Sequence, residues 1–373
     1  MNTPVLFCIF NRLDIVEKTF EPIRRAKPKR LYIAADGARK EKCGEDVLTE
    51  QVRNYVINRI DWDCEVKTLF RNENLGCDIA ISDALEWFFS NEEEGIVIED
   101  DVLTSSQFFD FCELMLDTYR DNPKVRYIAG FIRIPAENMP ESYYFVPKAN
   151  TWGWAAWRRS FFPENGVAYK YHKSNYYEKQ ANTNEILNQV LTTKKLKKCL
   201  TKCAYEFFFR VNQWDLEFYT YGMVYNPNSL SIAPSKTLTS HIGDYGFHFT
   251  GENNPGNIDI CDYDITKIKI RENIVMDSDI NEKIMLDEFF HKYYKKYGNE
   301  NIDIKAVKSD YYREKYRFVK SFFMFLYYKF IKFSNLKAKN QWNAFLELLK
   351  NPEIKIFEAF YIYATMCYKN KTK

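Results

Sequence analysis

Residues 95–111 read GIVIEDDVLTSSQFFDF, and this stretch decides the fold class. The apolar run at 96–98 predicts a buried strand, because short continuous apolar segments are typical of strands covered on both faces. Three carboxylates, Glu99, Asp100 and Asp101, follow this run directly. Adjacent carboxylates repel one another, so a strand end that carries three of them needs a cation or solvent to compensate their charge.

The hundred residues that end in this stretch alternate between strand-like and helix-like patterns. Apolar runs predict the strands, and amphipathic periodicity predicts the helices. The expected strands cover 4–10, 30–36, 65–71 and 95–101, and the expected helices cover 13–26, 45–60 and 77–91. The order βαβαβαβ predicts an α/β fold, in which helices flank a mostly parallel, Rossmann-like central sheet.

The rest of the chain gives weaker structural signals. A helix is expected from about residue 104 to 125 and a strand at 125–131, followed by a cluster of tryptophan and glycine at 151–162. Helical patterns return at 176–203 and again from residue 213. Residues 240–259 are rich in Gly, Asn and Asp and are expected to form a long loop, the kind of element that closes over enzyme sites.

Composition and charge exclude several classes of protein. The chain has 373 residues, of which 46% are hydrophobic and 28% charged, so it has enough apolar material for a large core. A formal net charge of +2 gives no reason to expect a nucleic-acid partner. Nine cysteines without Cys-x-x-Cys spacing, and no secretory signal or apolar run of about 18 residues, predict a cytoplasmic protein that does not span a membrane.

Polar side chains follow the strands at the edge where such sheets bind ligands. They are Asn11, Arg12, Asp36, Arg71, Glu99, Asp100 and Asp101. Carboxylate ligands, with the other positions left to water and phosphate, are typical of Mg²⁺ or Mn²⁺. A solvated acidic turn is the competing interpretation, and the position of the triplet at a strand end favours the metal.

Four motifs in order carry a resemblance to a known family. VIEDD (97–101), QFFDFCELML (107–116), TWGWAAW (151–157) and QWD (213–215) resemble the GT-A glycosyltransferases related to N-acetylglucosaminyltransferase I and their bacterial relatives. The resemblance runs over roughly residues 3–250. It implies a metal-dependent, inverting transfer of a sugar, GlcNAc first, from a UDP-sugar to a saccharide or lipid-linked saccharide, in the assembly of bacterial surface polysaccharide or lipooligosaccharide.

The resemblance also implies how the chain is divided into domains. A GT-A catalytic domain is expected over 1–260, with a nucleotide-sugar half at 1–103 and an acceptor half at 104–260. A mainly helical C-terminal region is expected over 261–373.

The family's pattern assigns roles to the acidic triplet and to two other strand ends. It implies that Asp101 binds Mn²⁺ or Mg²⁺ at the diphosphate, with Asp100 and Glu99 near the ribose and the donor sugar. Arg12 matches a position that contacts the diphosphate or the base, and Asp36 resembles a uracil-binding aspartate. The alternatives are a surface arginine at a helix start and an Asp-Gly turn.

Four further residues are expected to bind the nucleotide-sugar at this edge. They are Asn11, Arg71, Asn74 and Gly76. Asn74 and Gly76 precede a helix, where the backbone can approach a nucleotide closely. A plain loop with a helix start competes with this interpretation.

The tryptophan motif is expected to face the sugar. Trp152 and Trp154, with Gly153 between them, can form an apolar platform, because the C–H groups of a pyranose ring pack on aromatic faces. Core tryptophans are the alternative.

The resemblance places the catalytic base after a tryptophan. An inverting transfer needs one base to deprotonate the acceptor hydroxyl. Asp215 is the residue implied, with Glu217 as the alternative because the second adjacent acid of the relatives is missing. His241 and His248 lie in the Gly-rich loop, where an imidazole can contact the diphosphate or complete the metal shell, and His248 is assigned to the metal.

Two other functions compete with this one. A sugar-nucleotide nucleotidyltransferase would share the sheet and the acidic site, but it normally carries a glycine-rich basic loop after the first strand, which CIFNRLD (8–14) lacks. A non-catalytic carbohydrate-binding protein with a degenerate site is the other alternative.

The segment at 311–339 has a composition of its own. Lysines and arginines alternate there with aromatic residues, a pattern typical of a helix that lies in a membrane interface. The competing interpretation is a helix packed on the catalytic domain or on the partner of a homodimer.

Overall fold

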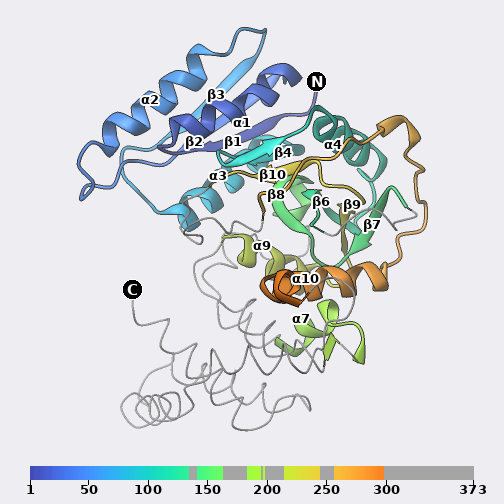
Figure 1. The fold of residues 1–373 in the computed structure, drawn as a ribbon. Coiled ribbons are helices and arrows are strands. Elements are labelled where there is room, and N and C mark those ends of the chain that lie inside the picture. The colour runs from blue at the N-terminus through green and yellow to red at the C-terminus, as the bar shows by residue number, and fades with distance from the viewer. Residues whose placement is uncertain (134–140, 163–182, 195, 198–213, 244–255, 298–373) are drawn as a thin grey trace, which may run out of the picture. The chain divides into compact units, whose positions relative to one another are not determined.

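Figure 1 shows the computed structural model, which describes residues 1–133, 141–162, 183–194, 196–197, 214–243 and 256–297. The chain divides into two compact units. The first comprises Met1–Lys170 and Ser229–Asp277, and the second comprises Tyr171–Asn228 and Ser278–Lys373. The expected domain bounds at residues 103 and 260 stay a prediction.

The N-terminal part of the first unit has the expected elements. The strands are β1 (Val5–Ile9), β2 (Arg30–Ala35), β3 (Glu65–Phe70) and β4 (Glu94–Glu99), and the helices between them are α1 (Leu13–Ala26), α2 (Glu45–Asn58) and α3 (Cys77–Asn91). β1 pairs in parallel with β2 and with β4, and β2 pairs in parallel with β3. The predicted βαβαβαβ order is confirmed.

The other strands of the first unit extend this sheet. They are β6 (Val125–Phe131), β7 (Tyr143–Val146), β8 (Asn150–Trp157) and β9 (Leu230–Pro234), and the sheet order is β3-β2-β1-β4-β8-β6-β9-β7. β8 runs antiparallel to β4 and β6, β6 runs parallel to β9, and β7 runs antiparallel to β9. The tryptophan motif is therefore a central strand, and the predicted α/β class with a mostly parallel sheet is confirmed.

Two expectations differ in detail from the structure. Helix α4 (Ser106–Thr118) ends before residue 125, and Pro123 shortly beyond it lacks the backbone N–H that a continuing helix needs. The expected loop at 240–259 begins inside a strand, β10 (Thr239–His241), which pairs antiparallel with β5 (Val102–Thr104). Residues 244–255 of that loop lie outside the described part.

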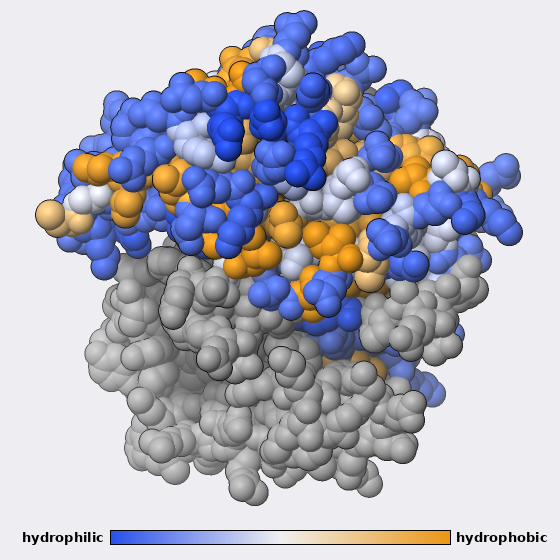
Figure 2. Space-filling view, turned by 45° about the horizontal axis from the view of Figure 1, so that its top comes forward, coloured by the Kyte–Doolittle hydropathy of each residue, from blue (hydrophilic) through white to orange (hydrophobic). Residues whose placement is uncertain are grey.

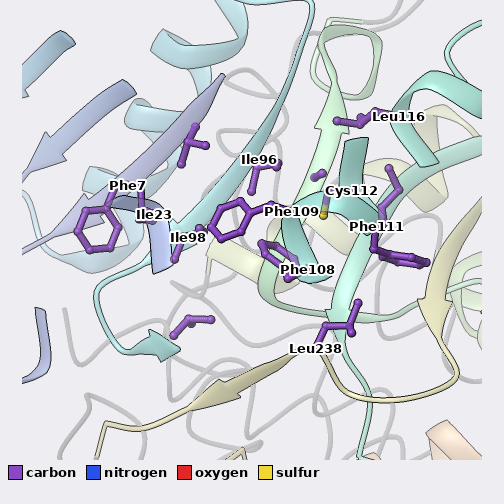
Figure 3. Close-up of a cluster of buried hydrophobic side chains, with 14 of the residues drawn as sticks. Phe7, Ile23, Ile96, Ile98, Phe108, Phe109, Phe111, Cys112, Leu116 and Leu238 are labelled. Atoms are coloured by element: carbon purple, nitrogen blue, oxygen red, sulfur yellow. The ribbon is translucent and has the colours of Figure 1, made fainter. Parts of the chain in front are cut away.

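Helices cover both faces of the sheet. On one face α1 and α4 pack on alternate residues of the strands, and Figure 3 shows Phe7, Ile98 and Phe109 in this core. On the other face α3 supplies Phe88, whose ring lies 4.9 Å from the ring of Tyr32. The alternation of buried side chains along β1, β2 and β4 thus follows the period of two that a strand imposes.

The described helices of the second unit are α7 (Thr183–Val190), α9 (Trp214–Tyr225) and α10 (Ser278–Tyr297). Side-chain amides join them, because Gln189 donates to the carbonyl of Met223 at 2.8 Å and Asn281 donates to the carbonyl of Val190 at 2.9 Å. None of the helices within the described ranges has the length and apolarity to cross a membrane. The segment 311–339 lies outside the described residues, so its membrane or dimer contact stays a prediction.

The surface of the described part is mostly hydrophilic, and apolar side chains show on it in several small groups (Figure 2). The most exposed large apolar side chains include Val275, Val47 and Ile79, which belong to three separate segments. Val47 adjoins the exposed Leu48, and Ile79 follows the exposed Leu75 by four residues. Small apolar groups of this kind are normal on globular proteins and do not by themselves mark an interface.

Gly95 of β4 tests how closely α3 packs on the sheet. A Cβ at this position would lie 2.2 Å from Cζ of Phe88 and 3.2 Å from the carbonyl oxygen of Pro4. We expect Gly95→Ala to lower the free energy of unfolding by about 1–3 kcal/mol, because a fully buried ring has to move. Denaturant unfolding followed by circular dichroism measures this, and an unchanged midpoint would contradict the packing.

Candidate functional site

The ends of β1 and β4 bring Arg12 to the acidic triplet. These parallel strands end at the same edge, with Cys8 paired to Glu99. The Nη2 atom of Arg12 donates to Oδ1 of Asp100, and it donates to Oδ2 of Asp101 at 2.9 Å. Arg12 is therefore a cation that compensates the repulsion between the two aspartates.

Asp100 is the more enclosed of these two carboxylates. It is 5% exposed, and its Oδ2 accepts from the backbone N–H of Phe10 at 3.0 Å. Its backbone carbonyl accepts from the hydroxyl of Thr19 at 2.8 Å. Burial raises the pKa of Asp100 above its ordinary value, although the charge of Arg12 acts against this. The contacts of Asp100 hold Arg12 to the end of β1, and its predicted place near the ribose stays a prediction.

Asp101 faces a histidine that the short ladder of β5 and β10 positions. Val102 pairs with His241 across this ladder, and the backbone N–H of Ile242 donates to the carbonyl of Asp101 at 2.8 Å. The Nε2 atom of His241 lies 3.2 Å from Oδ2 of Asp101. Burial by itself would raise the pKa of Asp101, but the hydrogen bond and charge of His241, together with Arg12, hold it below its ordinary value.

The histidine at this carboxylate is thus His241. His248, the one assigned to the metal from the sequence, lies outside the described residues. The signal that could have selected His241 is its place in β10 opposite the strand that follows the acidic triplet. That pairing joins residues far apart in the chain, so no local pattern of residues predicts it.

The donor atoms fit a divalent ion that takes the rest of its ligands from a substrate. Asp101 offers carboxylate oxygens, and His241 offers an imidazole nitrogen beside them. Within the described ranges no group of three or more His, Cys, Asp or Glu side chains could hold a metal by itself. An ion such as Mg²⁺ is commonly held by one or two carboxylates plus water and substrate phosphates, so the carboxylate of Asp101 is the ligand that fits it, and His241 lies beside that carboxylate.

Gly243 brings the backbone after β10 down onto the ion pair. A Cβ at Gly243 would lie 3.1 Å from Nη1 of Arg12 and 3.1 Å from Cβ of Asp101. A side chain at this position would crowd both groups. The segment that carries His241 therefore covers Arg12 and Asp101 closely.

Trp152 lies beside the same histidine. Its ring centroid is 5.1 Å from that of His241 and 4.7 Å from that of Phe131. The hydroxyl of Thr239 donates to the carbonyl of Trp152 at 2.6 Å, which ties β8 to β10. Trp152 is only partly buried. Because it lies beside His241, it is the member of the predicted sugar platform that lies near Asp101.

The other two residues of the predicted platform, Trp154 and Gly153, are buried in the structure. Trp154 is fully buried and packs near Phe89 and Tyr127, as the core alternative expects. Gly153 has φ +73°, and a Cβ there would lie 2.8 Å from Cγ2 of Thr239. Glycine is therefore needed at 153 both for its backbone conformation and for the close approach of β10.

Asp36 holds two loops together at the ends of β2 and β3. Its Oδ1 accepts from the backbone N–H groups of Gly37 and Leu75, both at 3.0 Å. Its Oδ2 accepts from Leu75 at 3.1 Å and from Gly76 at 3.0 Å. Gly76 has φ +80° and precedes α3, so this carboxylate fixes the start of that helix. The uracil-binding role of Asp36 stays a prediction.

The remaining expected residues of this edge are engaged with acidic side chains. Arg71 donates from Nη2 to Oδ2 of Asp83 at 2.5 Å. Asn11 donates from Nδ2 to Oε1 of Glu45 at 2.9 Å, and the same carboxylate also binds Arg39. Asn74 donates from Nδ2 to the carbonyl of Gly37 at 2.7 Å, beside Asp36. The structure therefore gathers Arg12, Asp100 and Asp101 in one cluster and Asp36, Asn74 and Gly76 in another.

The two candidate bases lie in the second unit. Asp215 is partly buried and belongs to the first turn of α9, as the sequence expects from the helix that follows residue 213. Glu217 lies on the same helix. The choice between them stays a prediction.

Comparison with known proteins gives fold-level likenesses only. No protein-family model and no curated protein matches the chain. Similar solved structures include S. aureus TarS, with 12% identity and a TM-score of 0.34 over 56% of this chain and 44% of that chain. Mouse xyloside xylosyltransferase 1 in its apo form has 11% identity and a TM-score of 0.30, over 61% and 83% of the two chains.

HddC from Yersinia pseudotuberculosis is also similar, with 10% identity and a TM-score of 0.27 over 45% of this chain and 83% of that chain. This chain spans less than half the length of the TarS chain. Likenesses of this strength carry no argument about function, so the function has to be argued from the site.

The contacts of Asp36 predict a structural effect on its substitution. In Asp36→Asn an amide NH₂ would face backbone N–H groups in place of a carboxylate oxygen. We expect the free energy of unfolding to fall by about 1–3 kcal/mol, the cost of leaving buried donors without an acceptor. Thermal unfolding measures this. Asp46→Asn, at an exposed carboxylate, is the control and should leave the midpoint unchanged.

Proposed function

We propose that the chain is a metal-dependent, inverting glycosyltransferase that moves a sugar, GlcNAc first, from a UDP-sugar to a saccharide or lipid-linked saccharide acceptor. The observation that carries the proposal is the cluster of Arg12, Asp101 and His241 at the ends of β1, β4 and β10. It joins a guanidinium to two donors for a divalent ion, at the edge where α/β sheets bind ligands. That combination suits a metal-bound diphosphate.

Each group in the cluster has a role in this proposal. Asp101 and His241 would hold Mn²⁺ or Mg²⁺, which supplies Lewis-acid stabilisation of the diphosphate leaving group when bound. Arg12 would give charge-assisted hydrogen bonds to the diphosphate oxygens. Trp152, which is only partly buried, would offer an apolar face to the C–H groups of the donor sugar. Asp215, or Glu217 in its place, would take the proton from the acceptor hydroxyl.

The products distinguish this function from its two competitors. A glycosyltransferase releases UDP from a UDP-sugar, whereas a nucleotidyltransferase releases pyrophosphate from UTP and a sugar phosphate. A binding protein with a degenerate site releases neither. Assays of UDP release from a panel of UDP-sugars, and of pyrophosphate release from UTP and sugar phosphates, both with Mn²⁺, therefore test the proposal, and pyrophosphate release without UDP release would overturn it.

Asp101 is the residue on which metal-dependent binding should depend. We expect Asp101→Ala to abolish Mn²⁺-dependent binding of UDP, because the variant loses the carboxylate that would hold the ion. Calorimetry of UDP binding with and without Mn²⁺ measures this. Asp110→Ala, at an exposed acid on α4, should bind as the wild type does. Equal UDP affinity of Asp101→Ala and wild type in Mn²⁺ would contradict the metal assignment.

Asp215 should act on the acceptor step alone. We expect Asp215→Asn to keep donor affinity and to lose transfer by roughly 10²- to 10⁴-fold, the usual effect of removing a general base. Single-turnover transfer measured beside calorimetric UDP binding separates the two effects. Near-wild-type transfer would move the role to Glu217, and a product with the retained anomeric configuration would refute a mechanism with a single inverting base.

A further inference from the structure

Arg12 binds two carboxylates that differ in how firmly they are held. The Nη2 atom of Arg12 donates to Asp100 and to Asp101. Asp100 also accepts from the backbone N–H of Phe10, and its own carbonyl accepts from Thr19, so the scaffold fixes its position. The side chain of Asp101 is 14% exposed, against 7% for that of Asp100. Arg12 therefore has a fixed partner in Asp100 and a more exposed partner in Asp101.

The carboxylate that fits a metal ion already has two nitrogen partners within the chain itself. Oδ2 of Asp101 accepts from Nη2 of Arg12 at 2.9 Å and lies 3.2 Å from Nε2 of His241. A carboxylate oxygen has two lone pairs, so these contacts can occupy both lone pairs of Oδ2. A divalent ion that binds Asp101 therefore has to displace a nitrogen from Oδ2, or it has to bind Oδ1 close to the positive charge of Arg12.

The balance of charge in this cluster acts in the same direction. One guanidinium and two carboxylates leave one negative charge at the ends of β1 and β4. A divalent ion alone would reverse that sign in a largely enclosed cluster, and an uncompensated buried charge is costly. A diphosphate that binds together with the ion brings negative charge and restores the balance. The charges therefore favour the ion with a diphosphate over the ion alone.

The hydrogen bonds of Arg12 suit an exchange of partners. A guanidinium presents five N–H donors, and its planar shape matches the oxygens of both carboxylates and phosphates. Phosphate oxygens can thus take over the hydrogen bond that Arg12 gives to Asp101, while Asp100 keeps the guanidinium in place. The carboxylate of Asp101 is then free for the ion when the anion has bound.

We propose that Arg12 competes with a divalent ion for Asp101, and that the diphosphate relieves this competition, so that metal and diphosphate bind cooperatively. The inference rests on the proposed metal-bound UDP-sugar and adds that the site binds metal weakly when no nucleotide is present. Direct bonds between an ion and phosphate also couple the two ligands. The role of Arg12 therefore has to be tested on the ion alone.

Electron paramagnetic resonance of free Mn²⁺, in a titration without nucleotide, tests this inference. We expect Arg12→Gln to bind Mn²⁺ about 5- to 150-fold more tightly than the wild type, the range typical of coupled sites. Arg12→Lys keeps a positive charge and should gain much less. Arg25→Gln, at an exposed arginine in the last turn of the same helix, is the matched control and should not change the affinity. An arginine with a purely structural role would give weaker Mn²⁺ binding on its loss.

A second measurement covers the case in which Arg12→Gln is unstable. The two aspartates of this variant lack the guanidinium, and an ion that takes its place should raise the melting temperature, because a ligand that binds the folded state stabilises it. We expect Mn²⁺ without nucleotide to raise the melting temperature of Arg12→Gln more than that of the wild type. NaCl at equal ionic strength is the control for screening of the charges.

The outcomes separate this inference from the proposed function. If the wild type binds Mn²⁺ equally well with and without UDP, competition by Arg12 is wrong while the glycosyltransferase proposal stands. The same holds if Arg12→Gln gains neither affinity nor stability from Mn²⁺ beyond the wild type. If the wild type binds neither UDP nor Mn²⁺ when both are present, both proposals are wrong.

Discussion

The ion pair of Arg12 with Asp100 and Asp101 is the interaction on which the candidate site depends. Two acids end one strand, and a single guanidinium from the neighbouring strand end binds both. Removing one partner of an enclosed pair leaves an uncompensated charge, which typically costs about 3–5 kcal/mol. The turn from β1 into α1 and the end of β4 are therefore held by charge as well as by packing.

The remaining parts of the site are arranged around this pair. Asp100 is tied to the backbone at Phe10, so it fixes the place of Arg12. Asp101 points to the segment that returns from far along the chain as β10 and carries His241. Gly243 lets this segment approach Arg12 and Asp101 without a side chain between them. One carboxylate thus serves the scaffold, while its neighbour meets the groups that would contact a ligand.

The loops after β2 and β3 are also held by a carboxylate, but within the described ranges this carboxylate binds backbone groups and no cation. Among the described residues, the groups that donate to Asp36 are backbone N–H groups, so it acts as the anchor of a loop. In the sequence, an aspartate that anchors a loop and an aspartate that binds a ligand look the same, because both follow a strand. Only the partners of the carboxylate separate the two roles, and those partners come from the loop after the next strand.

The sequence by itself determined the first half of the fold, because the apolar and amphipathic periods that specify βαβαβαβ are local properties of the chain. It also identified the edge of the sheet at which polar side chains gather, since parallel strands end together. The tertiary structure decided which of those side chains meet. His241 reaches Asp101 through the pairing of β10 with β5, and Trp154 enters the core while Trp152 lies beside His241. Such contacts join residues that are distant in the sequence, and their geometry depends on strand register and on backbone packing at glycines, which no local pattern of residues encodes.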